Sequence, residues 1–333
     1  MVVLEGYPVL VTGGCGYLGS RTVSALIDAG CKVSVIDDLS SGSRVVLDPR
    51  ASFFDGGIEN APLVRGVIEM RGVRAVIHLA GSGDAGDSVG APMRYYRSNT
   101  TASRALIESA LASGVHQFLM SSSAEVYDPN VSMPVTEAAD AKPPTPYAMS
   151  ELMKERILVD TADGFGLSYC VLRHPFTVGG DPRLHGGRLY GQGTVIEAAV
   201  AAAIGKRDIV RIAVTDGATP DGTALREFIT VDDVASAHVA ALRTMLSRPQ
   251  WRGVFNCGSG QGFSELEVAG AVERVTNLKV RRAERTPMAG EALARVLDSS
   301  AFRNATGWRP AHCDLDDLVR IVYYGVASQL RVA

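Results

Sequence analysis

Short apolar runs alternate with longer stretches of helical periodicity through the first half of the chain. The runs predict strands, and they are Pro8–Thr12, Lys32–Asp37, Ala75–Leu79, Gln117–Ser121 and Leu167–Leu172. Helical periodicity covers residues near 91–113 and 147–164. Strands that are apolar throughout, rather than at every second position, are typical of a parallel sheet that is buried on both faces. The pattern therefore predicts a doubly wound α/β domain, with helices on both faces of a parallel sheet.

The sequence changes character after Phe176. Residues 179–193 are rich in glycine and predict a long loop. Beyond it we expect a helix over 195–204, a strand over 228–231 and a helix over 233–247. We therefore expect a first domain over 1–175, to which parts of 226–262 return, and a smaller mixed α/β domain over 176–333.

Composition and charge narrow the class of protein. The 333 residues are 46% apolar and 21% charged, as in ordinary globular proteins. The net charge of −3 gives no basic surplus for binding nucleic acid. The longest apolar run, Ala198–Ile204, is far shorter than the roughly 20 residues that cross a membrane, and the N-terminus lacks the pattern of a signal peptide. Five scattered cysteines indicate neither a metal site nor disulfides, which favours a cytoplasmic protein.

A glycine-rich turn follows the first predicted strand. Gly13, Gly16 and Gly19 form GxxGxxG between a strand and a helix. Such glycines let the backbone turn tightly and approach a pyrophosphate at the helix N-terminus. Asp37 closes the next strand, where a carboxylate accepts a hydrogen bond from a ribose 2′-OH and repels a 2′-phosphate. The turn therefore favours NAD over NADP, and the alternative is a tight strand–helix turn without a ligand.

Hydroxyl side chains gather at the end of one strand and the start of one helix. Ser121, Ser122 and Ser123 end a predicted strand, where side chains of a parallel sheet face the ligand crevice. They equally suit a helix cap or a turn. Tyr147 begins the helix over 147–164, where a packing role is the alternative to a catalytic one.

Five segments occur in an order that resembles a known superfamily. TGGCGYLGS, the serine strand, PYAMSELMKE, DGTALREFITVDDVASAHVAAL and FNCGSGQGFSELEV follow one another as in the extended short-chain dehydrogenases/reductases. The chain is most similar to the UDP-galactose 4-epimerase branch of the NAD-dependent epimerase/dehydratase family. The resemblance spans Val9 to Pro310, and its most specific part is Asp221–Leu242. It implies a Rossmann domain followed by a substrate-binding domain.

The resemblance implies a reaction that is redox-neutral overall. Tyr147 would remove the proton from the 4-OH of a nucleotide sugar, and Ser123 would share that proton. Hydride would pass from C4 to bound NAD⁺ and return to the other face of the 4-keto sugar. The expected partner is a nucleotide-sugar substrate.

The resemblance also assigns binding residues. The expected cofactor-binding residues are Gly13, Gly16, Tyr17, Leu18, Asp37, Asp38, Leu79, Ala80, Gly81, Asn99, Ser121, Tyr147, Glu151 and His174. The expected substrate-binding residues are Ser123, Tyr147, Phe176, Thr194, Arg226, Arg285 and Arg295. Relatives commonly form homodimers through the helices near 91–113 and 147–164, and Leu152 and Leu158 suit such a contact.

One matched position departs from the pattern. The family's helix reads Tyr-x-x-x-Lys, and Glu151 occupies the lysine position. A carboxylate there would raise the pKa of Tyr147, whereas the lysine lowers it. A tyrosine with its ordinary pKa near 10 is only about 0.1% ionised at pH 7. Lys154 lies roughly 10 Å from Tyr147 along the helix axis, and we interpret it as a solvated surface lysine. Either Glu151 accepts hydrogen bonds from the ribose diol, or the nicotinamide charge acts alone.

Further positions keep other functions open. Phe176 stands where the family has an asparagine, and Arg295 lies near the sugar pocket, unless it is a surface arginine. Glu125 could remove a C5 proton after C4 oxidation, which would make the protein a nucleotide-sugar dehydratase, decarboxylase or C5-directed epimerase. Ala124 stands where dehydratases carry an acid. A non-catalytic NAD-binding sensor is the third possibility, and Glu151 is its main argument.

Overall fold

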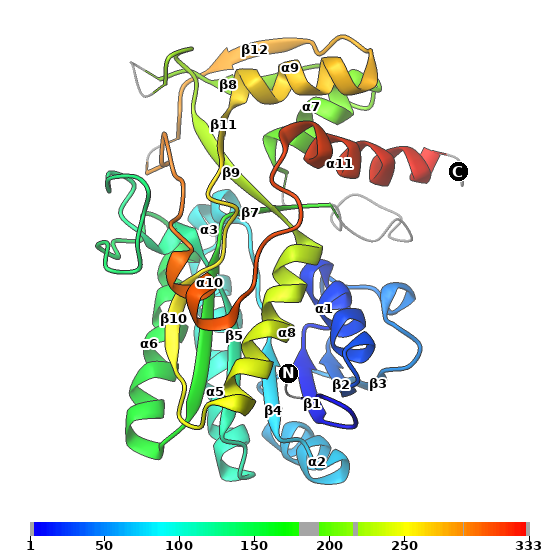
Figure 1. Cartoon of the computed structure of the whole chain (residues 1–333), viewed down its shortest axis with the longest axis vertical. Helices are drawn as coiled ribbons and strands as arrows, with labels where there is room; N and C mark the ends of the chain where they lie inside the picture. The colour runs from blue at the N-terminus through cyan, green and yellow to red at the C-terminus, as the bar shows by residue number, and fades with distance from the viewer. Residues whose placement is uncertain (1–2, 180–192, 216–218, 289, 331–333) are drawn as a thin grey trace.

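A seven-stranded parallel sheet forms the base of the molecule (Figure 1). The computed structural model describes residues 3–179, 193–215, 219–288 and 290–330. The strands, in spatial order, are β10 (Gly253–Asn256), β6 (Ser168–His174), β5 (Gln117–Ser123), β4 (Ala75–His78), β1 (Pro8–Thr12), β2 (Lys32–Asp37) and β3 (Ser52–Asp55). The strand order reverses between β1 and β4, and ligands of doubly wound sheets bind at the carboxyl edge beside such a reversal.

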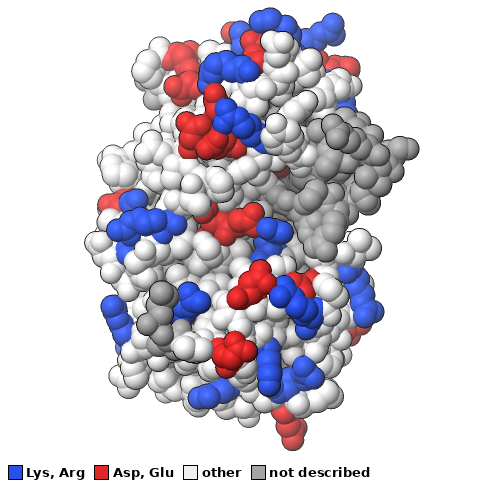
Figure 2. Space-filling model, turned by 45° about the vertical axis from the view of Figure 1, so that its right-hand side comes forward, with Lys and Arg blue, Asp and Glu red and all other residues white. Residues whose placement is uncertain are grey.

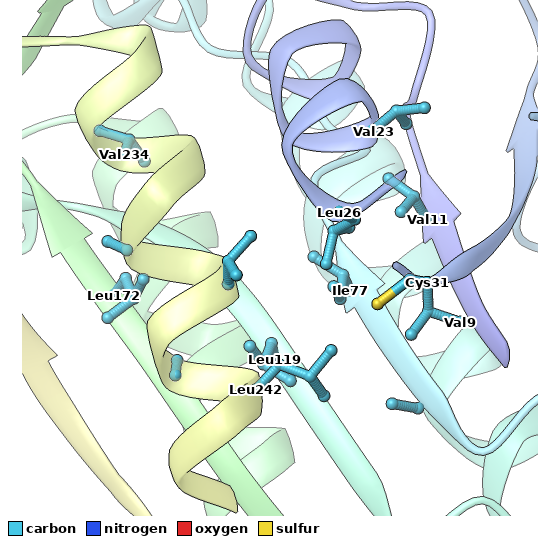
Figure 3. Close-up of a cluster of buried hydrophobic side chains, with 14 of the residues drawn as sticks. Val9, Val11, Val23, Leu26, Cys31, Ile77, Leu119, Leu172, Val234 and Leu242 are labelled. Carbon is cyan, nitrogen blue, oxygen red and sulfur yellow. The ribbon is translucent and has the colours of Figure 1, made fainter. Parts of the chain in front are cut away.

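Two layers of helices cover the sheet. α1 (Tyr17–Asp28) and α8 (Val231–Ser247) lie side by side on one face. Figure 3 shows their side chains, including Leu26 and Leu242, packed over β4, β5 and β6. α2 (Ala61–Arg71), α5 (Ala102–Ala112) and α6 (Pro146–Phe165) cover the other face through residues such as Leu106 and Leu158. Adjacent residues of each strand enter opposite layers, so the strands are apolar throughout.

A smaller unit lies at the carboxyl ends of the sheet strands (Figure 1). Its mixed three-stranded sheet contains β11 (Gly262–Ser264), β9 (Leu225–Thr230) and β7 (Phe176–Val178), and β12 (Arg282–Arg285) pairs with β8 (Val210–Ala213). α7 (Val195–Ala203), α9 (Glu265–Thr276) and α11 (Leu315–Leu330) pack around a core that includes Val200, Phe228 and Leu318. Most of the loop expected over 179–193 lies outside the described residues.

The chain passes between the two units more than once. β9 leads from the smaller unit into α8, which packs on α1, and β10 then adds the last strand to the large sheet. α10 (Ser300–Thr306) packs against α8 and β10. The seven-stranded sheet is therefore built from two separate stretches of sequence.

Short elements connect the sheet to the crevice. They are η1 (Arg44–Val46), α3 (Ala85–Gly90), α4 (Pro92–Tyr95), the π-helical turn η2 (Tyr96–Thr101) and η3 (Ala124–Val126). The helix expected over 91–113 is therefore divided into α4, η2 and α5. A π-helical turn changes which side chains face inward, and such turns often occur at functional sites.

The surface carries both signs of charge. On the face seen in Figure 2, Lys and Arg side chains are interspersed with Asp and Glu. Within the described residues, no helix has the length and apolar character of a membrane span, and no three potential ligand side chains gather as for a metal ion. All five cysteines are free thiols.

Candidate active site

The turn between β1 and α1 brings two backbone segments together where the strand order reverses. Gly13 has a φ of +72°, and a Cβ atom there would lie 2.7 Å from the Cα atom of Ala80, just after β4. A Cβ atom on Gly19 would lie 1.9 Å from the carbonyl oxygen of Gly13. The N-cap of α1 is Gly16, which has no side chain to cap the helix. Because helix N-termini attract phosphate, the turn fits the pyrophosphate of a dinucleotide.

The neighbouring residues expected around the cofactor line the same two turns. Tyr17 is the first residue of α1, and Leu18 follows it and packs against the core below. Leu79 packs on that same core from the turn after β4. Ala80 packs on the core of the opposite face. The glycine turn and the turn after β4 therefore form the two sides of one crevice.

Asp37 ends β2 beside this crevice and is 8% exposed. Its Oδ2 atom accepts a hydrogen bond from the Cys15 N–H at 2.8 Å, and its Oδ1 atom accepts one from the Leu39 N–H at 2.9 Å. Burial raises the pKa of Asp37, and these hydrogen bonds oppose the shift. Each carboxylate oxygen has a further lone pair for a ribose hydroxyl. Asp38 is exposed and accepts a hydrogen bond from the N–H of Ser40.

Asn99 joins the loop after β4 to helix α6. It is fully buried in the π-helical turn η2. Its Nδ2 atom donates to the Ser82 carbonyl at 2.9 Å and to the Ser150 hydroxyl at 3.0 Å, and its Oδ1 atom accepts from the Ser82 N–H at 2.8 Å. A Cβ atom on Gly81 would lie 3.0 Å from that Oδ1 atom. Asn99 therefore ties the loop after β4 to α6.

Ser121 and His174 form a fixed pair at the ends of β5 and β6. The Nδ1 atom of His174 lies 3.1 Å from the Pro175 carbonyl, to which it can only donate, so Nε2 accepts from the Ser121 hydroxyl at 2.8 Å. Burial lowers the pKa of His174 to about 4. The imidazole is neutral at pH 7 and holds Ser121 in one orientation.

Ser123 and Tyr147 meet above the end of β5. Tyr147 lies in the first turn of α6, and its side chain hydrogen-bonds Ser123. The Ser123 hydroxyl also accepts from the Glu125 N–H at 3.1 Å, so its capping role and its contact with the tyrosine coexist. Burial, then the charges of Glu151 and Glu125, raise the pKa of Tyr147 well above its usual value, and Ser123 opposes this. The phenol is therefore protonated at neutral pH.

Glu151 pairs with Lys154 one turn further along α6. The Nζ atom of Lys154 lies 2.8 Å from Oε1 of Glu151, and the two side chains are 5% and 6% exposed. Our interpretation of Lys154 as a solvated surface lysine is wrong. The axial rise separates the Cα atoms as calculated, but helical side chains lean toward the N-terminus, which carries the ammonium group back to Glu151.

A second buried ion pair lies beside the first. Arg173 at the end of β6 binds Glu155 through Nε and Nη2, with the shortest separation 2.6 Å. Ser122 donates its hydroxyl to the same carboxylate. The guanidinium also lies 4.8 Å from the ring centre of Tyr127. All of these groups use one another as partners, so this pair stabilises the join between α6 and the sheet.

Glu125 lies in η3, and its charge acts on Tyr147. Burial raises the pKa of Glu125, while the positive charges of Arg295 and Arg226 oppose the shift. Arg295 donates from Nη2 to the Tyr127 carbonyl at 3.3 Å. Burial lowers the pKa of Arg295, and Glu125 opposes that shift. Arg295 is therefore half-buried near Glu125 rather than a freely solvated surface residue.

Two arginines expected to bind the diphosphate share one carboxylate. Arg226, which is 7% exposed, contacts Glu291 through Nη2 and lies 3.1 Å from Glu265 through Nε. Arg285 binds both oxygens of Glu291, at 2.8 and 2.7 Å. The two guanidinium groups come from β9 and β12 and are held together in the smaller unit. Phosphate oxygens are the natural further partners of such a cluster.

Phe176 and Thr194 lie at the remaining edge of the smaller unit. Phe176 begins β7, is 40% exposed, and has its ring centre 6.4 Å from that of Phe228. Thr194 is buried as the N-cap of α7, where its hydroxyl accepts from the Glu197 N–H. Phe176 therefore offers an apolar surface, whereas the Thr194 hydroxyl is used by the helix cap.

Several residues of this site were not predicted from the sequence. Glu155 lies eight positions after Tyr147 on the same helix, and only its partner Arg173 from β6 reveals its place beside the site. The partners of Arg226 are 39 and 65 residues away in the sequence, so no local pattern indicates Glu265 or Glu291.

The fold and the site together define a class of protein. A parallel sheet with a glycine turn at its reversal point, an acidic residue after β2 and a serine–tyrosine pair after β5 is the arrangement of a dinucleotide-dependent enzyme. The chain belongs to the NAD dependent epimerase/dehydratase family, whose family model matches residues 9–258.

Two similar proteins are UDP-glucose 4-epimerases. A UDP-glucose 4-epimerase of Azospirillum brasilense is 39% identical over 315 residues, which cover 94% of this chain and 90% of that relative. A UDP-glucose 4-epimerase of Lactobacillus helveticus is 32% identical, with 93% and 94% covered. Both of these similarities extend beyond the Rossmann sheet into the smaller unit.

Solved structures share the whole architecture. UDP-glucose 4-epimerase from Stenotrophomonas maltophila, solved with NAD and formylated UDP-arabinopyranose, superposes with a TM-score of 0.91 at 31% identity. The match covers 98% of this chain and 100% of that one. The enzyme from Brucella ovis in complex with NAD gives 0.89 at 31% identity, covering 96% and 98%.

Proposed function

We propose that this protein is an NAD-dependent 4-epimerase of a UDP-sugar. The observation that carries the proposal is the Ser123–Tyr147 hydrogen bond, which joins the carboxyl end of β5 to the first turn of α6. The shared activity of the relatives supports it, and it is favoured over a dehydratase, a decarboxylase, a C5-directed epimerase or a non-catalytic sensor.

The crevice suits NAD. Gly13 and Gly19 leave no room for a Cβ atom, and Asp37 offers acceptors for ribose hydroxyls with a charge that disfavours a 2′-phosphate. NAD⁺, when bound, would accept hydride from C4 of the sugar and later return it. The residues that would hold it are those of the glycine turn, Asp37, the turn after β4 and the cofactor-facing part of α6.

Tyr147 would move the proton of the sugar 4-OH. Its phenol oxygen is oriented by Ser123, so the two hydroxyls would bracket the O4 atom of the sugar. Arg226 and Arg285 would hold the diphosphate, with Glu265 and Glu291 fixing their guanidinium planes. Phe176 would cover part of the nucleotide with its exposed ring.

The test follows sugar protons by NMR in D₂O with NAD⁺ and UDP-glucose, UDP-galactose and their uronates. A C4 epimer without deuterium on carbon is the expected result, because the hydride leaves and returns directly. Deuterium at C5, or loss of water or CO₂, would assign the chemistry to Glu125 instead and overturn the epimerase proposal. NAD binding without any conversion of the sugars would support the sensor.

We also propose a homodimer and a cytoplasmic location. The dimer would form through the outward faces of α5 and α6, where Met153 is 41% exposed. Leu158 does not belong to that surface, because it is fully buried against the sheet. Free thiols at all five cysteines suit a reducing compartment. Light scattering of the purified protein would test the dimer, and a monomer at micromolar concentration would overturn it.

A further inference from the structure

The ring of Tyr147 has a second contact besides the hydrogen bond with Ser123. That hydrogen bond holds the phenol hydroxyl, but a contact at one atom leaves the ring free to tilt about it. The ring of Tyr95 packs against the ring of Tyr147, with the ring centres 6.2 Å apart and an interplanar angle of 73°. Aromatic pairs favour this edge-to-face arrangement. The direction in which the phenol points therefore depends on both contacts.

Tyr95 is itself held in place by its neighbours. It is the last residue of α4 and is 1% exposed. Its hydroxyl donates to Oδ2 of Asp87 on α3 at 3.0 Å, and the backbone N–H of Asp84 hydrogen-bonds the same hydroxyl. The guanidinium of Arg94 lies 5.2 Å from the centre of the Tyr95 ring and pairs with Asp87. The ring of Tyr95 is therefore fixed by α3 and by the loop that precedes α3.

The π-helical turn η2 aligns this segment with α6. Among residues 92–100, Tyr95 and Asn99 are the buried ones, and they lie four positions apart. Asn99 donates to the Ser150 hydroxyl at 3.0 Å, and this hydroxyl donates to the Tyr147 carbonyl at 2.7 Å. Tyr95 therefore contacts the ring of Tyr147, while Asn99 holds its backbone through Ser150.

We propose that Tyr95 is a positioning residue for proton transfer by Tyr147, because its ring fixes the direction in which the phenol points. The inference rests on the epimerase function proposed above. Proton transfer requires the phenol oxygen to lie within about 3 Å of the sugar hydroxyl. A displacement of about 1 Å can lower the rate about a hundredfold. The hydroxyl of Tyr95 is used by Asp87 and the Asp84 backbone, so Tyr95 acts through its ring.

The experiment separates the ring of Tyr95 from its hydroxyl. Tyr95→Leu removes the ring, whereas Tyr95→Phe keeps it, and the conversion of UDP-galactose is measured at saturating NAD⁺. In Tyr95→Leu, kcat should fall about ten- to a hundredfold, while KM for the sugar and Kd for NAD⁺ stay within about twofold of the wild type. In Tyr95→Phe, kcat should stay within about threefold of the wild type, because the ring still packs against Tyr147.

Phe302→Leu is the matched control. Phe302 is another fully buried aromatic residue, on α10, and its ring centre lies 5.5 Å from that of Trp308. Its replacement also removes a buried ring but should leave kcat unchanged. An equal decrease of kcat in Phe302→Leu would overturn the proposal, since the decrease would then reflect lost stability. A Tyr95→Phe variant as impaired as Tyr95→Leu would also overturn it, since the hydroxyl rather than the ring would then matter.

A further variant keeps the test decisive if Tyr95→Leu does not fold. Tyr95→Met fills more of the same volume with a flexible side chain and should show the same decrease of kcat at unchanged KM. A wild-type kcat in this variant, or a rise in KM in place of the decrease, would overturn the proposal. Loss of activity in Tyr147→Phe alone would overturn only the role of Tyr95. A wild-type protein that converts none of the UDP-sugars in the NMR test would overturn the epimerase function and this inference together.

Discussion

Tyr147 is set between two carboxylates and one hydroxyl, and these three groups define its chemistry. Glu151 and Glu125 favour the phenol, whereas Ser123 favours the phenolate. Replacing Tyr147 by Phe should lower kcat about a hundred- to ten-thousand-fold, the usual contribution of a proton-transferring group. A coupled assay of UDP-galactose conversion measures this, with Tyr324→Phe on the exposed face of α11 as the control. A decrease of kcat by less than tenfold would show that Tyr147 does not transfer the proton.

The charge of Glu151 should affect how kcat depends on pH. Its negative charge raises the pKa of Tyr147, so its removal in Glu151→Gln should lower that pKa. Because the ionised phenol is the base, the rise of kcat with pH should move to lower pH. Measurement of kcat from pH 6 to 10 tests the shift against Asp160→Asn on the same helix. An unmoved profile would mean that the two groups are not coupled in the holoenzyme.

Single residues could be assigned from the sequence where their role depends on local geometry. Gly13 and Asp37 followed from the strand–turn–helix pattern, and the structure places both beside the reversal of the sheet. Lys154 was misjudged because axial distance alone does not describe a long, flexible side chain. Glu291 could not be found at all, since its contact with Arg226 depends on the complete fold.

At the scale of elements, the turn from β1 to α1 should be intolerant of a single methyl group. Gly13→Ala adds a Cβ atom 2.7 Å from the Ala80 backbone at a positive φ, so we expect NAD⁺ affinity to fall about tenfold or more with loss of stability. Gly205, with φ of +76° and nothing within 4 Å of its Cβ position, is the matched control. Gly205→Ala should cost only about 1 kcal/mol. Equal NAD⁺ affinities for both variants would contradict the role of the turn.

The two strands that carry arginines should govern substrate affinity. Arg226→Ala removes one of two guanidinium groups and leaves the buried Glu265 with only Arg285, 3.8 Å away, so the dissociation constant of UDP should rise about tenfold or more. Calorimetry with UDP measures this, and NAD⁺ binding should stay unchanged. Arg282→Ala, at an exposed position of β12, is the control. UDP affinity equal to that of the wild type would place the diphosphate elsewhere.

Strands and helices could be predicted from the sequence where their apolar residues form a clear run or a clear helical period. β1 and β2 have the bounds that their apolar runs predicted, and α6 begins within one residue of its prediction. β3 and β10 were missed because neither of these four-residue strands has the longer apolar run that indicated β4. The π-helical turn η2 was also missed, since it depends on the contacts of Asn99 with distant segments.

At the scale of the whole molecule, the buried imidazole of His238 should make the stability of the fold depend on pH. His238 is fully buried on α8, donates from Nδ1 to the Val234 carbonyl at 2.9 Å, and has no partner for Nε2 among the described residues. Burial lowers the pKa of His238 to about 4. The unfolded chain binds this proton near pH 6.5, so the contribution to stability is complete above that pH and is lost as the pH falls toward 4.

Relative to His238→Asn, the wild type should therefore lose about 2 kcal/mol of unfolding free energy between pH 7 and pH 5. Urea unfolding at both values measures the difference. His116→Asn, at an exposed position, should behave as the wild type does. An equal loss in wild type and His238→Asn would show that this imidazole does not contribute.

The return of the chain to its first sheet has a consequence for biosynthesis. α8 and β10 complete the large sheet only after the arginine-bearing β9 has been made. While the first 175 residues emerge from the ribosome, β6 is an open edge and the apolar layer beneath α8 is uncovered. The large sheet therefore cannot be completed until about residue 256 has left the exit tunnel. The smaller unit follows later still, because β12, which carries Arg285, and α11 lie beyond that point in the chain.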